Sequence, residues 1–492
     1  MSRLDSDAAT CLHCGKVRSE GDPTWETHRL ADTEVHLCGQ HAAPFALGVT
    51  WSALDRRARD RAAWEAAARE DDGRRARHEE RRRRVEARLA RIGAFDMLPL
   101  QIHSELSRRV AGQDEAKRTL ATAVRGHYRR GQMRMLEESD EHPPVRPDLL
   151  PKETVVLLGP TGCGKSFTCR TLSTIVDAPY WGDSLAKYTA EGWVGNSVEE
   201  LLGALVSVSD SFVPLAEKGI LFLDEVDKKA KRAAPGARDV GGEDLQFSLL
   251  QILETGGAKV FICPFVGGRR NPNQPLVEFD TRDVFFILGG AFVGLADIVG
   301  RRLGGRDRLG FGTPTDTPRD RQMRESELLH EALPCDLIEF GLIPELVGRC
   351  GSLAVFDPLS RGELRSILLD VDDAVVEQQR ARAQLEGFSL EFADEAIDAI
   401  CDRAYTSGMG ARRLRSLTGE VLTRIFFDMP SGVCRGGRRP RVIVTAATVA
   451  DPTAYEVVRA TRATGGTVTR LRESGPGETD ASAEAAEREC ST

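Results

Sequence analysis

The sequence predicts an α/β fold, in which helices flank a parallel sheet, followed by a smaller, mostly helical subdomain. Short apolar runs at 155–158, 220–223 and 284–288 are bounded by Gly, Pro or acidic residues and alternate with longer mixed segments. Buried parallel strands have this continuous apolar pattern. A glycine-rich segment follows the first run directly, as in nucleotide-binding α/β domains. Residues from about 361 to 427 have mostly helical patterns.

Composition limits the class of protein. The chain has 492 residues, enough for about three domains, and its net charge is −8. This acidic balance excludes a globally basic nucleic-acid coat, so nucleic acid is not an expected partner. The sequence contains no run of 18 apolar residues, the length that would suggest a membrane-spanning segment. The N-terminal residues lack an apolar signal core, and the 11 Cys then favour reduced thiols in the cytoplasm.

Changes of composition divide the chain into parts. Residues 1–48 are rich in Cys and His, and residues 49–96 are a charged helical linker. We expect residues 97–355 to form the large α/β subdomain and residues 356–457 the small one. Residues 458–492 have few large apolar side chains, which predicts a disordered tail.

The charged linker is dominated by Arg, Glu and Ala, which are good helix formers. Opposite charges recur four residues apart, as in Glu80 and Arg84, and support a helix surrounded by water. We therefore expect a solvated spacer helix. The alternative is a short coiled-coil seam through Val85, Leu89 and Ile92.

The segment GPTGCGKS at 159–166 has the spacing of a phosphate-binding loop, with a strand before it and a helix after it. We predict that Lys165 contacts the β- and γ-phosphates of ATP and that Ser166 binds Mg²⁺. Cys163 is either an oxidation-sensitive thiol or a small inert residue. The predicted nucleotide contacts in this loop are Gly159, Pro160, Thr161, Gly162, Cys163, Gly164, Lys165, Ser166 and Phe167.

The second apolar run ends in a pair of acids, Asp224 and Glu225. With a phosphate-binding loop upstream, Asp224 is predicted to hold Mg²⁺ through water and Glu225 to activate the attacking water as general base. The alternative is a solvated strand end. The third run continues into Gly289-Gly290-Ala291, where many nucleotide motors carry a polar sensor residue, and none is assigned here.

Two short motifs near the N-terminus, Cys11-x₂-Cys14 and Cys38-x₂-His41, have the spacing of paired zinc ligands. Cys₃His sets of this kind bind Zn²⁺ tetrahedrally. Since four protein ligands leave no open position for water, we expect a structural and not a catalytic zinc-binding module. Unliganded thiols are the alternative.

The order of these motifs resembles the ClpX family of AAA+ unfoldases, from about residue 97 to 430. VAGQDEAK is similar to the family's adenine-side box, which would place Val110 and Ala111 against the base. GARRLRS is similar to its second-sensor motif, with Arg412 as the contact from the small subdomain to the nucleotide. The resemblance implies an AAA+ P-loop NTPase fold that uses ATP and Mg²⁺.

The segment FGLIPELVGR is similar to the family segment that delivers an arginine finger, here Arg349. A guanidinium from a neighbouring subunit stabilises the charge of the phosphoryl-transfer transition state. The resemblance therefore implies a homohexamer in which Arg349 completes the site of the next subunit. A plain surface arginine is the alternative.

Other segments resemble loops that line the family's pore. GWVG is similar to the aromatic pore loop, so Trp193 and Val194 would grip a polypeptide by apolar contact, although Trp193 alone would suggest core packing. RDVGGE, with Arg238, is similar to the second pore loop. Arg269 and Arg270 lie in a segment similar to the loop that recognises degradation tags; a solvated basic loop is the alternative.

The tripeptide Leu309-Gly310-Phe311 resembles the family motif that docks into the ClpP peptidase, with a turn or packing role as the alternative. In the family the zinc module binds substrates or adaptors. We therefore expect an ATP-dependent unfoldase that threads unfolded or tagged proteins into ClpP. The alternatives are a remodelling chaperone without a peptidase, a nucleic-acid motor and a zinc scaffold with a silent ATPase fold.

Overall fold

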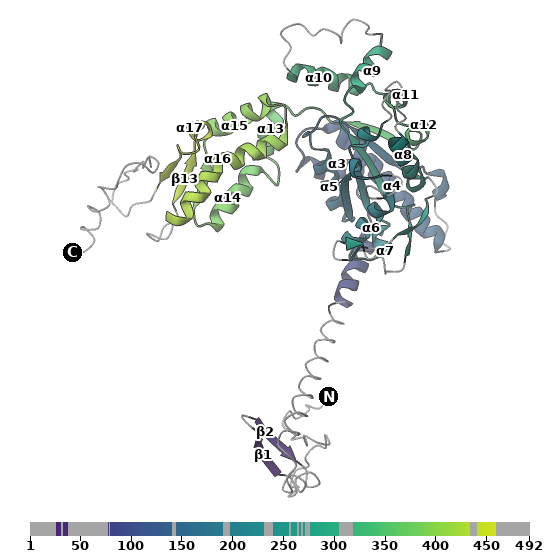
Figure 1. Cartoon of the computed structure of the whole chain (residues 1–492), viewed down its shortest axis with the longest axis horizontal. Helices are drawn as coiled ribbons and strands as arrows, with labels where there is room; N and C mark the ends of the chain where they lie inside the picture. Colours follow the sequence, from purple (N-terminus) through teal and green to yellow (C-terminus); the bar gives the residue numbers. More distant parts are fainter. Residues whose placement is uncertain are drawn as a thin grey trace, which may run out of the picture. The chain divides into compact units, whose positions relative to one another are not determined.

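Figure 1 shows the structure of the chain, a computed structural model. It describes residues 26–30, 33–37, 77, 79–139, 144–189, 197–230, 240–254, 257–262, 265–266, 269–270, 276–304, 318–432 and 440–458. The chain divides into two units, residues 1–84 and residues 85–492. Among the described residues, no helix is long and apolar enough to cross a bilayer.

The first unit contains an antiparallel hairpin. Strand β1 (Glu26–Leu30) pairs with β2 (Thr33–Leu37) along their full length. In the sequence this hairpin lies between the two pairs of predicted zinc ligands. The four predicted ligands lie outside the described residues; they are Cys11, Cys14, Cys38 and His41. Within the part of the chain that the structure describes, no cluster of His, Cys, Asp or Glu is arranged to hold a metal ion.

A five-stranded parallel sheet forms the centre of the second unit. Its strand order is β11-β3-β10-β5-β4, and all neighbouring pairs are parallel. The strands are β3 (Thr154–Leu158), β4 (Tyr180–Ser184), β5 (Ile220–Asp224), β10 (Phe285–Gly290) and β11 (Ser352–Val355). The three apolar runs of the sequence are the three central strands, which confirms the predicted α/β fold.

Helices cover both faces of this sheet. Alternate strand residues point to opposite faces, so each face buries its own apolar cluster. Leu223 and Leu288 pack with α6, α8 and α9, whereas Phe222 and Ile287 pack with α3, α4 and α5. The helices are α3 (Pro99–Ser107), α4 (Asp114–Glu138), α5 (Lys165–Val176), α6 (Val198–Val208), α7 (Val213–Ala216), α8 (Val240–Leu253), α9 (Leu295–Arg302), α10 (Pro318–Leu329), α11 (Pro334–Phe340) and α12 (Pro344–Val347).

Short elements complete the large subdomain. Two small antiparallel pairs, β6 with β9 and β7 with β8, lie between α8 and β10 in the sequence. Their bounds, with those of the 3₁₀ helices, are β6 (Lys259–Ile262), β7 (Phe265–Val266), β8 (Arg269–Arg270), β9 (Val277–Asp280), η1 (Pro147–Leu149), η2 (Leu185–Lys187) and η3 (Val226–Lys229).

The end of the charged linker differs from the prediction of a solvated spacer. Residues 79–93 are helical, but Val85 and Ile92 are buried in the same apolar cluster as α4 and α5. Apolar residues spaced four and three apart share one face of a helix. That face contacts the chain's own sheet domain, and not a coiled-coil partner. Arg91 also donates to the Asp177 carboxylate after α5, from Nε at 2.9 Å.

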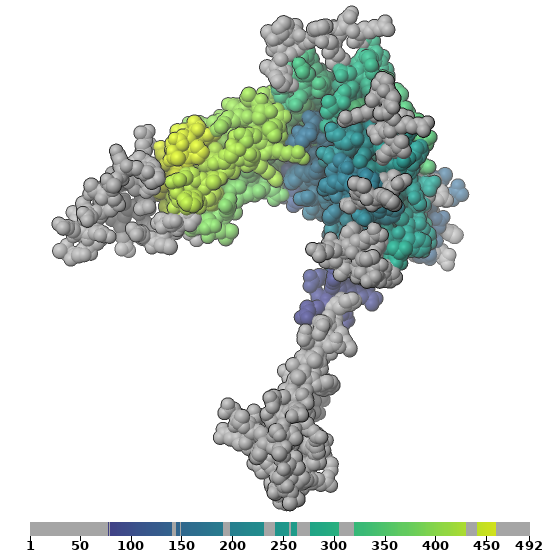
Figure 2. Space-filling model, viewed as in Figure 1, coloured from purple at the N-terminus to yellow at the C-terminus, as the bar shows by residue number. Residues whose placement is uncertain are grey.

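The small subdomain follows β11 and is mostly helical, as predicted (green to yellow in Figures 1 and 2). It also contains a three-stranded sheet, in which β12 pairs with β13 in parallel and β13 with β14 antiparallel. Its elements are α13 (Arg361–Leu369), α14 (Val375–Leu385), β12 (Ser389–Phe392), α15 (Asp394–Thr406), α16 (Ala411–Gly432), β13 (Arg441–Val444), α17 (Ala446–Ala450) and β14 (Glu456–Val458). Of the predicted tail, residues 459–492 lie outside the described residues.

Candidate functional site

The glycine-rich segment forms the turn between β3 and α5. Gly159, Gly162 and Gly164 have φ angles of 142°, 87° and 107°, values that residues with a Cβ rarely adopt. Helix α5 begins at Lys165, directly after this turn. The free N–H groups at a helix N-terminus and in a glycine-rich turn bind phosphate oxygens. The local geometry therefore fits the predicted phosphate-binding loop.

Two side chains of the loop are held by its own carbonyl groups. The Lys165 ammonium is buried and donates to the carbonyl oxygens of Gly159, at 2.5 Å, and Pro160, at 3.0 Å. Phosphate oxygens would compete for the same ammonium, since a charged acceptor binds it more strongly. The Cys163 thiol donates to the Pro160 carbonyl, and burial raises its pKa. A buried, protonated thiol is unreactive, which favours Cys163 as an inert packing residue.

The predicted acids lie where β5 ends, beside the loop. The Ser166 hydroxyl donates to Asp224 Oδ2 at 3.3 Å, so both predicted Mg²⁺ ligands lie side by side. Glu225 has a φ of 60° and accepts a hydrogen bond from the Ser184 hydroxyl at the end of β4. Oxygen ligands next to a phosphate-binding loop are the donors that Mg²⁺ prefers. These residues therefore fit a bound Mg²⁺–nucleotide.

A cavity of about 430 Å³ adjoins the loop and is lined by both subdomains. Most of the predicted nucleotide contacts line it, including Val110, Ala111 and Arg412. Apolar residues of the small subdomain, among them Ile367 and Val371, also line it and offer surface for a planar base. The size and mixed lining fit a nucleotide.

The phosphate loop contacts the small subdomain directly. The Ala411 N–H, at the start of α16, donates to the Gly162 carbonyl at 3.2 Å. A Cβ placed on Gly162 would lie 2.4 Å from the carbonyl oxygen of Met409. Only glycine permits so close an approach of two backbones. The phosphate loop and the predicted second-sensor segment therefore pack directly against each other.

Comparisons with known proteins agree with this arrangement. A family model described as AAA domain (Cdc48 subfamily) matches residues 150–352, and one described as the C-terminal, D2-small domain of ClpB protein matches residues 359–437. The ATP-dependent Clp protease ATP-binding subunit ClpX of Treponema denticola is 36% identical over 336 residues, which cover 68% of this chain and 77% of that protein. The chain belongs to the ClpX family. It is an AAA+ ATPase, and the cavity beside its phosphate loop agrees with that assignment.

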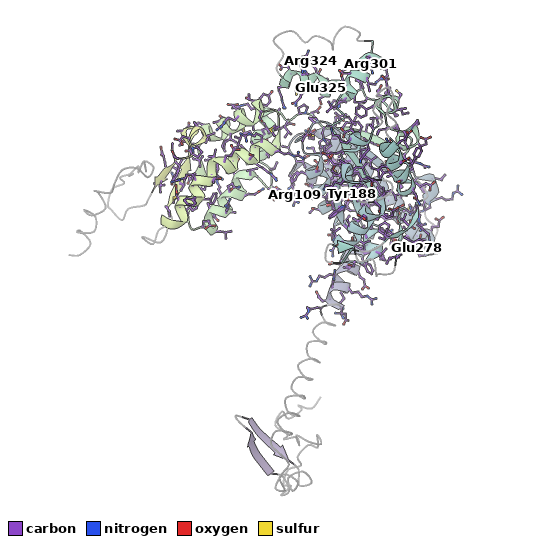
Figure 3. The ribbon with its side chains drawn as sticks, in the orientation of Figure 1. Arg109, Tyr188, Glu278, Arg301, Arg324 and Glu325 are labelled. Atoms are coloured by element: carbon purple, nitrogen blue, oxygen red, sulfur yellow. The ribbon has the colours of Figure 1, made fainter. Side chains whose placement is uncertain are left out.

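Sequence reasoning missed several residues that line the cavity of this ClpX-family chain. Arg109, labelled in Figure 3, precedes the adenine-side box, and Arg415 follows Arg412 by three residues on α16. Residues three apart share a helix face, so this spacing was a usable signal for Arg415. Asp227, buried in η3 after the two acids predicted to be catalytic, also lines the cavity, and no motif singled it out.

Arg349 follows α12 and does not line the cavity of its own chain. The predicted pore residues Trp193, Val194 and Arg238 lie outside the described residues. Arg269 and Arg270 form the backbone of β8, which pairs with β7. The predicted docking tripeptide Leu309-Gly310-Phe311 also lies outside the described residues.

Proposed function

We propose that this chain is an ATP-driven protein unfoldase and translocase. The observation that carries the proposal is the nucleotide cavity that both subdomains share, with Gly162 of the loop against Met409 of the small subdomain. Both subdomains contact the bound nucleotide. If ATP and ADP contact them differently, the two nucleotides favour different orientations of the small subdomain relative to the large one. Hydrolysis at this cavity therefore turns one subdomain relative to the other.

The loop and strand-end residues account for the hydrolytic chemistry. Ser166, and Asp224 through water, would hold Mg²⁺, which would supply positive charge next to the β- and γ-phosphates of a bound nucleotide. Lys165 leaves its loop carbonyls for phosphate oxygens, and Glu225 takes the proton of the attacking water. The Ser184 hydroxyl holds the Glu225 carboxylate at the strand end until the substrate arrives.

Hydrolysis is assigned to a ring of six identical subunits. Arg349 lies outside its own cavity, so a role in the neighbouring subunit's site fits its position. Each of the variants Arg349→Ala and Glu225→Gln should be inactive alone and should bind ATP. A mixture of the two should regain ATPase activity, because some interfaces then pair an intact Glu225 with an intact Arg349.

Polypeptide grip is assigned to the segments carrying Trp193, Val194 and Arg238. In the sequence, the first segment lies between η2 and α6, and the second between η3 and α8. Since η2 follows β4 and η3 follows β5, both segments are close in sequence to the strand ends at Ser184 and Glu225. Arg269 and Arg270 supply positive charge for the terminal carboxylate of a substrate tag.

Docking to a ClpP-type peptidase is assigned to Leu309 and Phe311, in the segment between α9 and α10. Apolar anchors on such a segment fit pockets of a partner ring. The N-terminal module, with Zn²⁺ held by Cys11, Cys14 and the Cys38–His41 pair, is assigned to substrate or adaptor binding. Reduced Cys ligands of this kind suit the cytoplasm.

The test follows a tagged fluorescent protein in the presence of ATP, with and without the ClpP peptidase of the same organism. We expect fluorescence to fall in both reactions and fragments to appear only with the peptidase. Phe311→Ala should abolish the fragments and leave unfolding intact. Unfolding without fragments under any condition would favour the remodelling chaperone, and no loss of fluorescence would refute the unfoldase.

A further inference from the structure

The end of β10 has no polar side chain, although it lies against the nucleotide cavity. Gly289 and Gly290 are buried, and Ala291 lines the cavity. A Cβ on Gly289 would lie 2.7 Å from the Phe222 ring, and a Cβ on Gly290 would lie 2.6 Å from Asp227 Oδ1. A sensor side chain on this strand end is therefore excluded by neighbours that already fill the space.

The carboxylate of Asp227 occupies the place that a side chain on Gly290 would take. Asp227 comes from η3, directly after the catalytic acids, and its side chain is only 4% exposed. Its Oδ2 accepts a hydrogen bond from the Phe292 N–H at 3.3 Å. Its Oδ1 is buried and has no hydrogen-bond partner among the residues that the structure describes.

An oxygen of this kind needs a donor. Burying a carboxylate oxygen without a hydrogen bond is energetically unfavourable, so native proteins rarely retain one without a use. Burial raises the pKa of Asp227, and Lys228 together with the backbone N–H groups of Phe292, Asp227 and Ala291 partly offsets that shift. Asp227 also lines the nucleotide cavity, so a group bound there is a candidate donor to Oδ1.

We propose that Asp227 positions the attacking water, in place of a sensor side chain at the end of β10. The inference rests on the proposed ATP hydrolysis and adds a residue to it. Water donates one hydrogen bond to Glu225 and the other to Asp227 Oδ1, which aligns its lone pair with the γ-phosphorus. As the new P–O bond forms, the bond to the β–γ bridging oxygen breaks and the water proton passes to Glu225.

The test compares Asp227→Ala and Asp227→Asn with wild type in steady-state ATP hydrolysis by the full-length protein. We expect Asp227→Ala to lower kcat by about 100-fold. KM, and the affinity for a fluorescent ATP analogue, should stay within about threefold, because the group acts on water and not on the nucleotide. Asp227→Asn keeps one oxygen and replaces the other with an NH₂ group, so it can accept only one of the two hydrogen bonds. We therefore expect its kcat to lie between that of Asp227→Ala and that of wild type.

The outcomes separate this inference from the rest of the mechanism. If wild type hydrolyses ATP and Asp227→Ala does so at an equal rate, Asp227 has no positioning role. If Asp227→Ala loses nucleotide affinity as strongly as it loses kcat, the residue only supports the fold of the cavity through Phe292, and the inference is wrong. If wild type itself hydrolyses no ATP, the proposed function fails together with this inference.

Discussion

The contact between the phosphate loop and the small subdomain makes a quantitative prediction for Gly162→Ala. The new Cβ would lie 2.4 Å from the Met409 carbonyl oxygen, about 1 Å closer than an ordinary contact, so the two backbones must separate. The Ala411 N–H to Gly162 hydrogen bond, now 3.2 Å long, would then exceed hydrogen-bond range. Such overpacking costs about 1–3 kcal/mol.

Gly164→Ala is the matched control, because Gly164 also has a left-handed φ, but a Cβ there would meet nothing within 4 Å. Both variants carry the backbone strain, and only Gly162→Ala carries the clash. Hydrogen exchange of the nucleotide-free protein, read by mass spectrometry on the peptide containing Ala411, measures the contact. We expect exchange about 5- to 150-fold faster in Gly162→Ala, from the same free energy, and unchanged in Gly164→Ala. Equal exchange in the two variants would refute the contact.

Three further changes test packing, titration and the metal module. Ile92→Ala should lower the free energy of unfolding in urea by about 3 kcal/mol, whereas Arg84→Ala, an exposed control, should change it by less than about 0.5 kcal/mol. Burial lowers the pKa of His127 from 6.5 to about 3, so the unfolded chain binds a proton between these values that the folded chain does not. Stability should therefore fall by about 2 kcal/mol from pH 7 to pH 5, and His127→Gln, which keeps a donor for the Asp283 carbonyl, should lose this part of the pH dependence. Cys38→Ser should remove bound zinc, measured by atomic emission, without changing ATP affinity; zinc retained at the wild-type level would contradict the assigned ligand set.

Local sequence patterns were sufficient to predict those parts of the fold and site that are formed by a single continuous segment. The three central strands and the phosphate loop are continuous segments, so their apolar runs and glycine spacing predicted them directly. The pairing of Ser166 with Asp224 also followed, because parallel strand ends meet at one edge of a sheet.

Residues whose role depends on distant partners were not predictable in the same way. Asp227 is one acid among several after β5, and its proposed role depends on Gly290 at the end of the neighbouring strand, β10. Val85 and Ile92 lie in a highly charged segment, and only the apolar surface beside α4 and α5 makes them core residues. The strands of the small subdomain are only three or four residues long, too short for a clear periodic pattern between helices.

Coupling between ATP turnover and mechanical work is the central claim, and one measurement tests it most directly. ATP hydrolysis and unfolding of a tagged fluorescent protein are followed in the same reaction for wild type, Trp193→Ala and Trp193→Tyr. We predict that Trp193→Ala hydrolyses ATP but leaves the substrate folded, whereas Trp193→Tyr, which keeps an aromatic ring, unfolds it. Unfolding by Trp193→Ala at the wild-type rate would contradict a grip on the threaded chain at this residue.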